Sequence, residues 1–393
     1  MKLFTETRVR VYARLIAFTL ALLYIVLMWM SYRSFLVSGA PVPAHDFLVF
    51  YGAGLLAGTG EASQAHDIER LFDVIRGQFP TIEGRAGWFY PPTNLAPFHM
   101  LAHLPYFAAY LLWIIGTLVF FAWALRPYVA RAAETWVIAA APAVWFNIVS
   151  GQNAFLVAGI VAVLYGAFQH RPIRAGLALG LLGIKPHLGL VFPVLLLGYR
   201  RWPASFVAAA TFAVMVGLSF LLYGVEAWRS FFGQNLEARS YLLATVLLPW
   251  SLMASPYVSA LSLGVPDGVA RGIHLVFCTA TIVLILYFIR RRVPFPMVFA
   301  FATVAAVPVS PHNFLYDWVL FALPVLILLR TFTAAALRPL EWTVIGAVYL
   351  APIGLLMIPQ EAKVSPGFLP VAALYLVFAL RCHQLAGQNT RTG

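Results

Sequence analysis

The sequence predicts an all-α polytopic membrane protein, and three observations lead to that class. Hydrophobic residues make up 62% of the 393-residue chain and charged residues only 10%, whereas a soluble domain carries about a quarter charged residues. Apolar runs recur that approach the roughly 20 residues one membrane-spanning helix needs. Runs of this length are too long for the strands of a membrane barrel, so the spans are expected to be helices.

The apolar runs and the charges between them predict about 12 spans. The first, 15–36, follows Arg8, Arg10 and Arg14, which places the N-terminus inside by the positive-inside rule. Threading the chain alternately then puts 17 of the 26 Lys and Arg residues inside and eight outside. The other expected spans are 106–125, 135–148, 155–168, 175–184, 188–197, 204–222, 269–289, 295–307, 315–329, 342–358 and 369–380.

Three stretches do not follow this pattern. Residues 93–104 and 252–265 are apolar but short, and the sequence does not decide whether they cross the membrane. Residues 224–251 are expected to form a second polar loop outside.

The polar stretch 38–92 after the first span is expected to be the functional loop of a single membrane domain, 1–393. It contains six of the 14 acidic residues, and long ordered loops in a compact architecture usually carry function. Segments 47–57 and 68–79 show helical periodicity with polar faces, so we expect amphipathic helices lying flat at the interface. The acidic residues are Asp46, Glu61, Asp67, Glu69, Asp73 and Glu83.

Asp46 is the first candidate for chemistry, because it lies just beyond a membrane span. Partial burial near a membrane surface can suit a carboxylate to proton abstraction, which would make Asp46 a general base. The alternative is a helix cap or a solvated loop acid.

Lys185 and His312 are the candidates for holding an anion. Lys185 is one of only three lysines and lies between apolar runs, where an ionisable group is a functional hypothesis that needs an anionic partner such as a phosphate. Snorkelling to the interface is the alternative. His312 precedes Asp317 in a second polar break, and a structural hydrogen bond to a backbone carbonyl is its alternative role. The threading places both breaks on the same side as Asp46.

Five further residues are candidates for substrate contacts. Tyr90, Gln152 and Asn153 have side chains that could hydrogen-bond sugar hydroxyls, or could equally cap and pack helix ends. His187 follows Lys185-Pro186, and its structural alternative is the same as that of His312. Asp67 could bind substrate or support the loop.

Several other functions find no support in the sequence. The formal charge of +12 comes from short Arg clusters between spans, which does not suggest nucleic-acid binding. The two cysteines, Cys278 and Cys382, lie in apolar runs and are expected to stay unpaired. We expect no metal and no cofactor, since the histidines lack metal-ligand spacing and neither a P-loop nor a dinucleotide fingerprint is present.

An ordered set of short motifs resembles a known family. Each motif is weak alone, but together they cover most of the chain: Asp46-Phe47 with Tyr51, Ala65-His66-Asp67, Tyr90-Pro91-Pro92, Gly151-Gln152-Asn153, Lys185-Pro186, Arg200-Arg201-Trp202, and Ser310-Pro311-His312 with Tyr316-Asp317. The set resembles the GT-C superfamily of membrane glycosyltransferases. Within it, the chain is similar to glycosyltransferase family 87, which includes the mycobacterial phosphatidylinositol mannoside mannosyltransferases.

The resemblance implies a GT-C type helical bundle and an inverting transfer. The donor would be a polyprenyl-phosphate sugar carrying a hexose, with mannose suggested by the family. The acceptor would be a lipid-linked or envelope glycan. The family pattern also implies that the enzyme works at the outer face of the cytoplasmic membrane. It would make Asp46 the catalytic base and place Lys185 and His312 at the donor phosphate. The family's first outer loop usually carries a tyrosine before its second acid, where this chain has His66.

The sequence is compatible with two other functional classes. Broken helices with intramembrane Lys and His would also suit a transporter or flippase for lipid-linked sugars. Polar motifs on one face only, and the long acidic loop, favour the enzyme. A non-catalytic assembly protein of the cell envelope is the second alternative, and a substitution at Asp46 would separate it from an enzyme.

Overall fold

The computed structural model describes residues 6–38, 45–82, 87–244, 249–332, 336–359 and 361–389. Within these ranges the chain forms α-helices and short 3-10 helices and no strand, which confirms the all-α class. Part of the predicted outer loop, residues 39–44 and 83–86 with Glu83, lies outside the described residues. The same holds for Lys2, Arg85 and Arg391 of the charge count.

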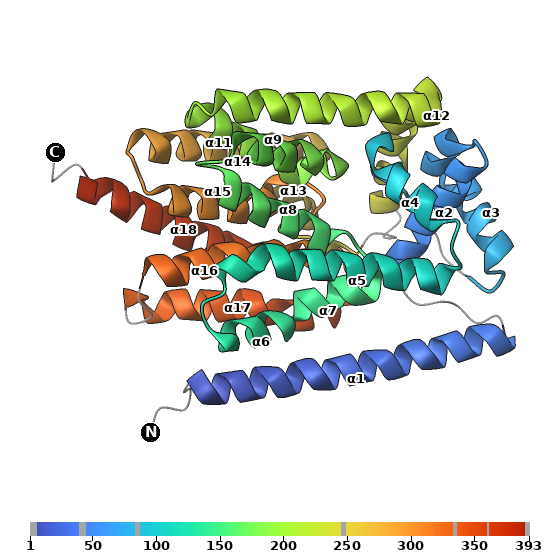
Figure 1. Cartoon of the computed structure of the whole chain (residues 1–393), viewed down its shortest axis with the longest axis horizontal. Helices are drawn as coiled ribbons and strands as arrows, with labels where there is room; N and C mark the ends of the chain where they lie inside the picture. The colour runs from blue at the N-terminus through green and yellow to red at the C-terminus, as the bar shows by residue number, and fades with distance from the viewer. Residues whose placement is uncertain are drawn as a thin grey trace.

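Six of the described helices are long and apolar enough to cross a membrane. They extend along the long axis of the molecule (Figure 1). The shorter α6 (Ala132–Ala139) and α7 (Pro142–Ser150) pass the same test together despite a 48° bend, which makes seven. The chain is therefore a multi-pass membrane protein. The six are α1 (Glu6–Ser38), α5 (Tyr106–Leu125), α12 (Trp202–Ala244), α14 (Asp267–Arg290), α17 (Pro339–Leu356) and α18 (Phe368–Asn389).

The expected total of about 12 spans is not confirmed, because the remaining apolar runs fold into shorter helices. At 1.5 Å per residue, the 14 residues of α8 (Ala154–Ala167) cover about 21 Å, against a hydrocarbon core of about 30 Å. The other short helices are α9 (Pro172–Leu181) with η4 (Leu182–Ile184), α10 (Pro186–Gly189), α11 (Phe192–Gly198), α15 (Phe295–Val309), η6 (Leu315–Phe321) and α16 (Ala322–Thr331).

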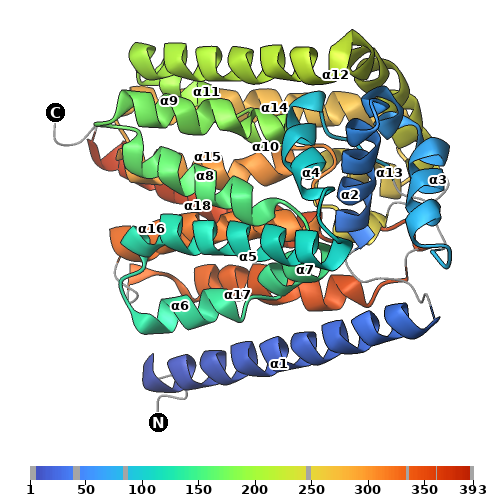
Figure 2. The same cartoon turned by 45° about the vertical axis from the view of Figure 1, so that its right-hand side comes forward.

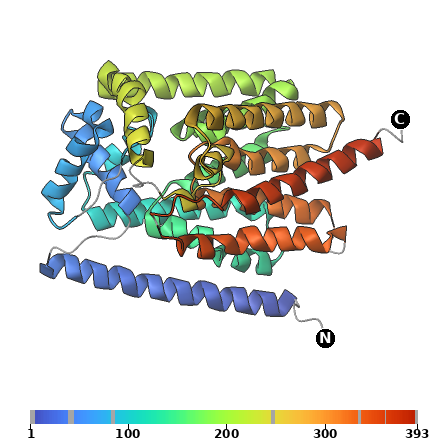
Figure 3. The ribbon, with the colours of Figure 1, turned by 180° about the vertical axis from the view of Figure 1, so that it is seen from behind.

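The two ends of the bundle differ in kind. α2 (His45–Gly58), α3 (Ile68–Gln78) and α4 (Leu95–Leu101) gather at one end, whereas α1 begins and α18 finishes at the other (Figures 1 and 3). The connections that carry most of the arginines, such as η3 (Arg126–Tyr128), lie at the end where α1 begins. This separation agrees with the expected opposition between the first loop and the N-terminus.

The two helices of the first loop do not behave alike. α3 is amphipathic as expected, with Leu71, Phe72 and Ile75 buried and the opposite side exposed. The expectation that residues 47–57 present a polar face is wrong, because α2 is buried along nearly its whole length. The physical reason is its packing, since α3, α4 and the 3-10 helix η1 (Ala62–His66) all cover it.

Neither of the two short apolar stretches forms a helix long enough to cross a membrane. Residues 93–104 form the end of η2 (Pro92–Asn94) and α4, and residues 252–265 contain α13 (Pro256–Ser262) after η5 (Trp250–Leu252). Each α-helix has seven residues and covers about 10 Å. α4 packs closely on α2, where a Cβ at Gly54 would lie 2.2 Å from the carbonyl oxygen of Phe98.

The prediction of a polar loop at residues 224–251 is wrong over most of that range. α12 continues to Ala244 and only bends at Gly224, whose φ of 75° and ψ of 173° are readily adopted by glycine alone. Residues 245–248 lie outside the described residues. α12 packs tightly along α9, and both cysteines are free as expected.

One long helix stands apart from the rest. α1 lies along the side of the bundle and packs chiefly against α6 (Figure 2). Its outward surface is apolar over most of its length, as expected for a helix that faces lipid.

Candidate active site

The start of α2 and the start of α8 meet at Asp46. The Gln152 side chain donates from Nε2 to Oδ2 of Asp46 at 3.1 Å, although 106 residues separate them. Asp46 lies in the first turn of α2, where the helix dipole favours a carboxylate, and it is half-buried. Gln152 itself is buried. The amide therefore holds the carboxylate in a defined orientation.

Gly151 makes this approach possible. It ends α7 with a φ of 73°, in the left-handed region that favours glycine. A Cβ at this position would lie 2.5 Å from Cβ of Phe47 and 3.1 Å from the Tyr110 ring. The Trp113 indole donates to the Gly151 carbonyl at 3.1 Å and fixes the same turn. The glycine thus lets the start of α8 reach the start of α2.

Tyr90 extends the network on the other side of Gln152. Its hydroxyl donates to Oε1 of Gln152 at 2.9 Å, and its carbonyl accepts from Nε2 of His66 at 3.1 Å. Burial raises the pKa of the Tyr90 phenol well above its ordinary value, and the charges of Asp317 and Asp46 raise it further. Tyr90 therefore stays protonated and acts as a hydrogen-bond donor.

Lys185 is almost completely buried and has an acidic partner within the protein. Its Nζ lies 2.7 Å from Oδ1 of Asp317 and 3.2 Å from Oδ1 of Asn153. The ammonium also lies over the Tyr316 ring, 4.8 Å from the centroid, and 5.9 Å from that of Tyr90. Lys185 is thus ion-paired within the protein, where the sequence suggested a cation awaiting a phosphate.

Asp317 is the residue that the sequence reasoning did not assign. It is fully buried in the first turn of η6, and its Oδ2 accepts from the backbone N–H of Phe314 at 3.3 Å. Asn313 satisfies the rest of the turn by donating to the carbonyls of Val307 and Ser310. An acid inside an apolar run needs a partner, and this requirement could have identified Asp317 from the sequence.

His312 and His187 flank this ion pair along the chain. His312 lies in the same connection as Asp317 and places its ring edge-on to Tyr257, with the centroids 5.5 Å apart. Ser255 donates to the Pro311 carbonyl at 2.7 Å and helps to hold that connection. His187 is half-buried in α10, directly after Lys185 and Pro186. Their roles toward substrate stay predictions.

Asp67 has a structural role in the loop. Its Oδ1 accepts from the backbone N–H groups of Glu69 at 3.0 Å and Arg70 at 3.1 Å, so it caps α3. Of the candidate residues, Asp67 is the one whose hydrogen bonds are explained by local helix capping. A contact with substrate stays a prediction.

Asn94 is a second polar residue that the sequence reasoning missed. It is fully buried, and neither its Oδ1 nor its Nδ2 has a hydrogen-bond partner among the described residues. Its neighbour Thr93 donates to the Gly183 carbonyl at 3.1 Å, two residues before Lys185. A buried amide without partners is costly, which makes Asn94 a candidate for binding a polar ligand.

The backbone N–H of Asn153 donates to Oε1 of Gln152 at 3.4 Å, so the network joins five of the eight predicted residues, from four breaks in the helices. Within the described part of the chain, no three His, Cys, Asp or Glu residues come together as metal ligands would. What the arrangement can do chemically is accept a proton at Asp46 and donate hydrogen bonds from buried neutral groups.

Comparison with known proteins identifies the family of this chain. No curated protein matches the chain, and no solved structure does. The model of glycosyltransferase family 87 matches residues 88–311, more than half of the chain. This match covers Tyr90, Gln152, Asn153 and Lys185. It confirms the resemblance carried by the short motifs, and the chain belongs to glycosyltransferase family 87.

Proposed function

We propose that this protein is an inverting hexosyltransferase that uses a polyprenyl-phosphate sugar, with Asp46 as its catalytic base. The family supplies glycosyl transfer, and it favours the enzyme over the transporter and assembly-protein alternatives. The observation that carries the proposal is the half-buried Asp46 carboxylate, oriented by the buried amide of Gln152.

The proposed reaction is a single displacement. The acceptor hydroxyl oxygen attacks the anomeric carbon of the sugar from the side opposite the phosphate, and its proton passes to Asp46. The bond between the anomeric carbon and the phosphate oxygen breaks, and the phosphate leaves with the electron pair. One carboxylate suffices, because phosphate is a good leaving group that needs little protonation, unlike the leaving groups of two-acid glycosidases.

The donor phosphate is proposed to bind at Lys185 and His312. An ammonium has three N–H donors, and Asn153 and Asp317 accept two of them, which leaves one for a phosphate oxygen. Asp317 balances the charge of Lys185, so a second positive charge is needed to offset that of the phosphate. We assign this charge to His312, which lies in the same connection as Asp317. These donors would stabilise the negative charge that develops as the phosphate leaves.

The other candidates are proposed to contact sugar or acceptor hydroxyls. Gln152 and Asn153 present amides, and Tyr90 a phenol, within the same network as Asp46 and Lys185. We add His187, two residues after Lys185, and Asp67, at the start of α3, as further candidates for these contacts. We propose a lipid-linked or envelope glycan as acceptor, and mannose as the sugar.

The proposed orientation places α2–α4 outside the cytoplasmic membrane. Arginine-rich connections lie at the opposite end of the bundle, and the positive-inside rule puts such an end in the cytoplasm. Membrane lipids surround the bundle, and the donor's polyprenyl chain would enter between helices.

A transfer assay tests the proposal. Purified protein in nanodiscs is incubated with a panel of polyprenyl-phosphate hexoses and a membrane lipid extract, and products are identified by mass spectrometry. We expect a hexose to be added to one lipid class from one donor. A nucleotide-sugar panel serves as the matched control. Transfer from nucleotide sugars alone, or none from any donor, would contradict the proposed donor class.

A further inference from the structure

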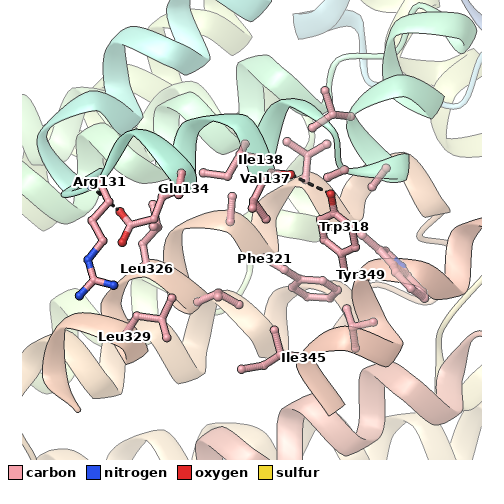
Figure 4. A pocket seen from close by; sticks show the side chains of 18 of the residues that line it. Arg131, Glu134, Val137, Ile138, Trp318, Phe321, Leu326, Leu329, Ile345 and Tyr349 are labelled. Carbon is pink, nitrogen blue, oxygen red and sulfur yellow. Dashed lines mark hydrogen bonds between the residues drawn. The ribbon is translucent and has the colours of Figure 1, made fainter. Parts of the chain in front are cut away.

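A cavity of about 840 Å³ is lined by none of the candidate site residues. Residues of α6, α7, η6, α16 and α17 line it, together with Val9 of α1. Its walls are mainly aliphatic and aromatic, and neither Asp46 nor Lys185 is among them. Figure 4 shows the apolar side chains between the two helical layers: Val137, Ile138, Phe321, Leu326, Leu329 and Ile345.

Two arginines line this cavity, and Figure 4 shows the first, Arg131, at the same end as Leu329, the residue before the second. Arg131 precedes α6 and Arg330 lies in the last turn of α16, and both side chains are exposed. Neither forms an ion pair with an acid among the residues the structure describes. Figure 4 shows the Arg131 side chain extending across the gap from α6 toward the helix that carries Leu329.

The one acid in the lining is already engaged. Glu134 accepts from the backbone N–H of Ala130 at 2.8 Å and of Arg131 at 3.2 Å, which caps α6. Its charge is therefore directed at the helix start rather than at a guanidinium. With two arginines and one glutamate, this end keeps a net positive charge.

We propose that the cavity binds an anionic phospholipid of the surrounding bilayer. The guanidinium groups of Arg131 and Arg330 would hold its phosphate, and the apolar walls would hold an acyl chain. Arginine matches phosphate geometry with paired N–H donors. Basic residues where a helix meets the membrane surface attract anionic headgroups. The net positive end favours a lipid with a net negative charge over a zwitterionic one.

Such a lipid would join elements that are far apart in sequence. Arg131 belongs to the start of α6, whereas α16 continues directly from η6, which carries Asp317. A ligand that binds only the folded protein stabilises it in proportion to the logarithm of its concentration over Kd. We therefore expect the anionic lipid to raise the unfolding temperature.

The test compares two lipids with identical acyl chains, phosphatidylglycerol and phosphatidylcholine, on the purified full-length protein. Native mass spectrometry counts retained lipid, and thermal unfolding in detergent with each lipid measures stabilisation. We expect preferential retention of phosphatidylglycerol and a larger rise in unfolding temperature. The double variant Arg131→Gln/Arg330→Gln should weaken phosphatidylglycerol binding by about tenfold or more, because two charge-assisted contacts are lost.

Matched variants separate the site from general charge effects. Arg200→Gln/Arg290→Gln removes two exposed arginines at other connections that do not line the cavity, and should retain the preference. Val325→Trp fills the cavity without changing charge, and should lower binding of both lipids. Equal retention of the two lipids by the unmodified protein would overturn the proposal. Equal losses of phosphatidylglycerol binding in the two double arginine variants would also overturn it. So would displacement of phosphatidylglycerol by a polyprenyl phosphate.

Discussion

Lys185 and Asp317 form a buried ion pair across 132 residues of sequence, with Nζ 2.7 Å from Oδ1. Both side chains are almost completely shielded from solvent. Two buried charges are tolerated because each compensates the other, and Asn153 and the Phe314 N–H add hydrogen bonds. The pair therefore links the η4–α10 break to the connection that carries His312.

Breaking this pair should destabilise the protein more than removing it. We expect Lys185→Met and Asp317→Leu to lower the unfolding free energy by about 3–5 kcal/mol each, because each leaves one buried charge uncompensated. The double variant Lys185→Met/Asp317→Leu should lose clearly less unfolding free energy than the two single variants lose together. The unfolding free energies of the four proteins in this double-mutant cycle are measured in mixed micelles. Additive losses would show that the two side chains do not depend on each other.

Gly151→Ala should destabilise the turn between α7 and α8. A left-handed φ costs a residue with a Cβ about 1–2 kcal/mol, and the added methyl would meet Phe47. Gly116→Ala is the matched control, since nothing lies within 4 Å of a Cβ there and the residue is inside α5. The control should be neutral or about 0.5–1 kcal/mol more stable. Equal stability of both variants would remove the special role of Gly151.

His66 should make stability depend on pH. Burial lowers the pKa of His66 to about 4, although its hydrogen bond to the Tyr90 carbonyl opposes this. Between that value and the ordinary 6.5, the unfolded chain binds more protons than the folded one, so stability falls as pH drops from 6.5 toward 4. The loss should reach about 3 kcal/mol. His66→Gln should flatten this part of the unfolding curve, and an unchanged slope would contradict a buried neutral histidine.

The proposed orientation predicts how single cysteines react with a membrane-impermeant thiol reagent. Thr59→Cys, after α2, should be labelled in intact cells, whereas Arg291→Cys, after α14, should be labelled only after permeabilisation. The unmodified protein, with Cys278 and Cys382, gives the background. Labelling of position 291 in intact cells would reverse the orientation and move the site to the cytoplasmic face.

Local patterns predicted the helical class, the amphipathic α3 and the polar breaks around Asp46, Gln152 and Lys185. They could not predict which breaks meet, because the Asp46–Gln152 and Lys185–Asp317 contacts join residues more than 100 positions apart. The polar residues of α12 beyond Gly224 suggested a loop, yet the helix continues to Ala244. The burial of α2 depends on α3 and α4 folding over it, which no local periodicity reports.

Turnover of Asp46→Asn tests most directly whether Asp46 removes the acceptor proton. The amide keeps the shape and a hydrogen-bonding oxygen but cannot accept the proton. Donor affinity should therefore persist while turnover falls by about 10² to 10⁴. Asp73→Asn, an exposed acid of the same loop paired with Arg76, is the control and should stay active. Near-normal turnover of Asp46→Asn in nanodiscs, with donor binding intact, would contradict the assignment of Asp46 as the base.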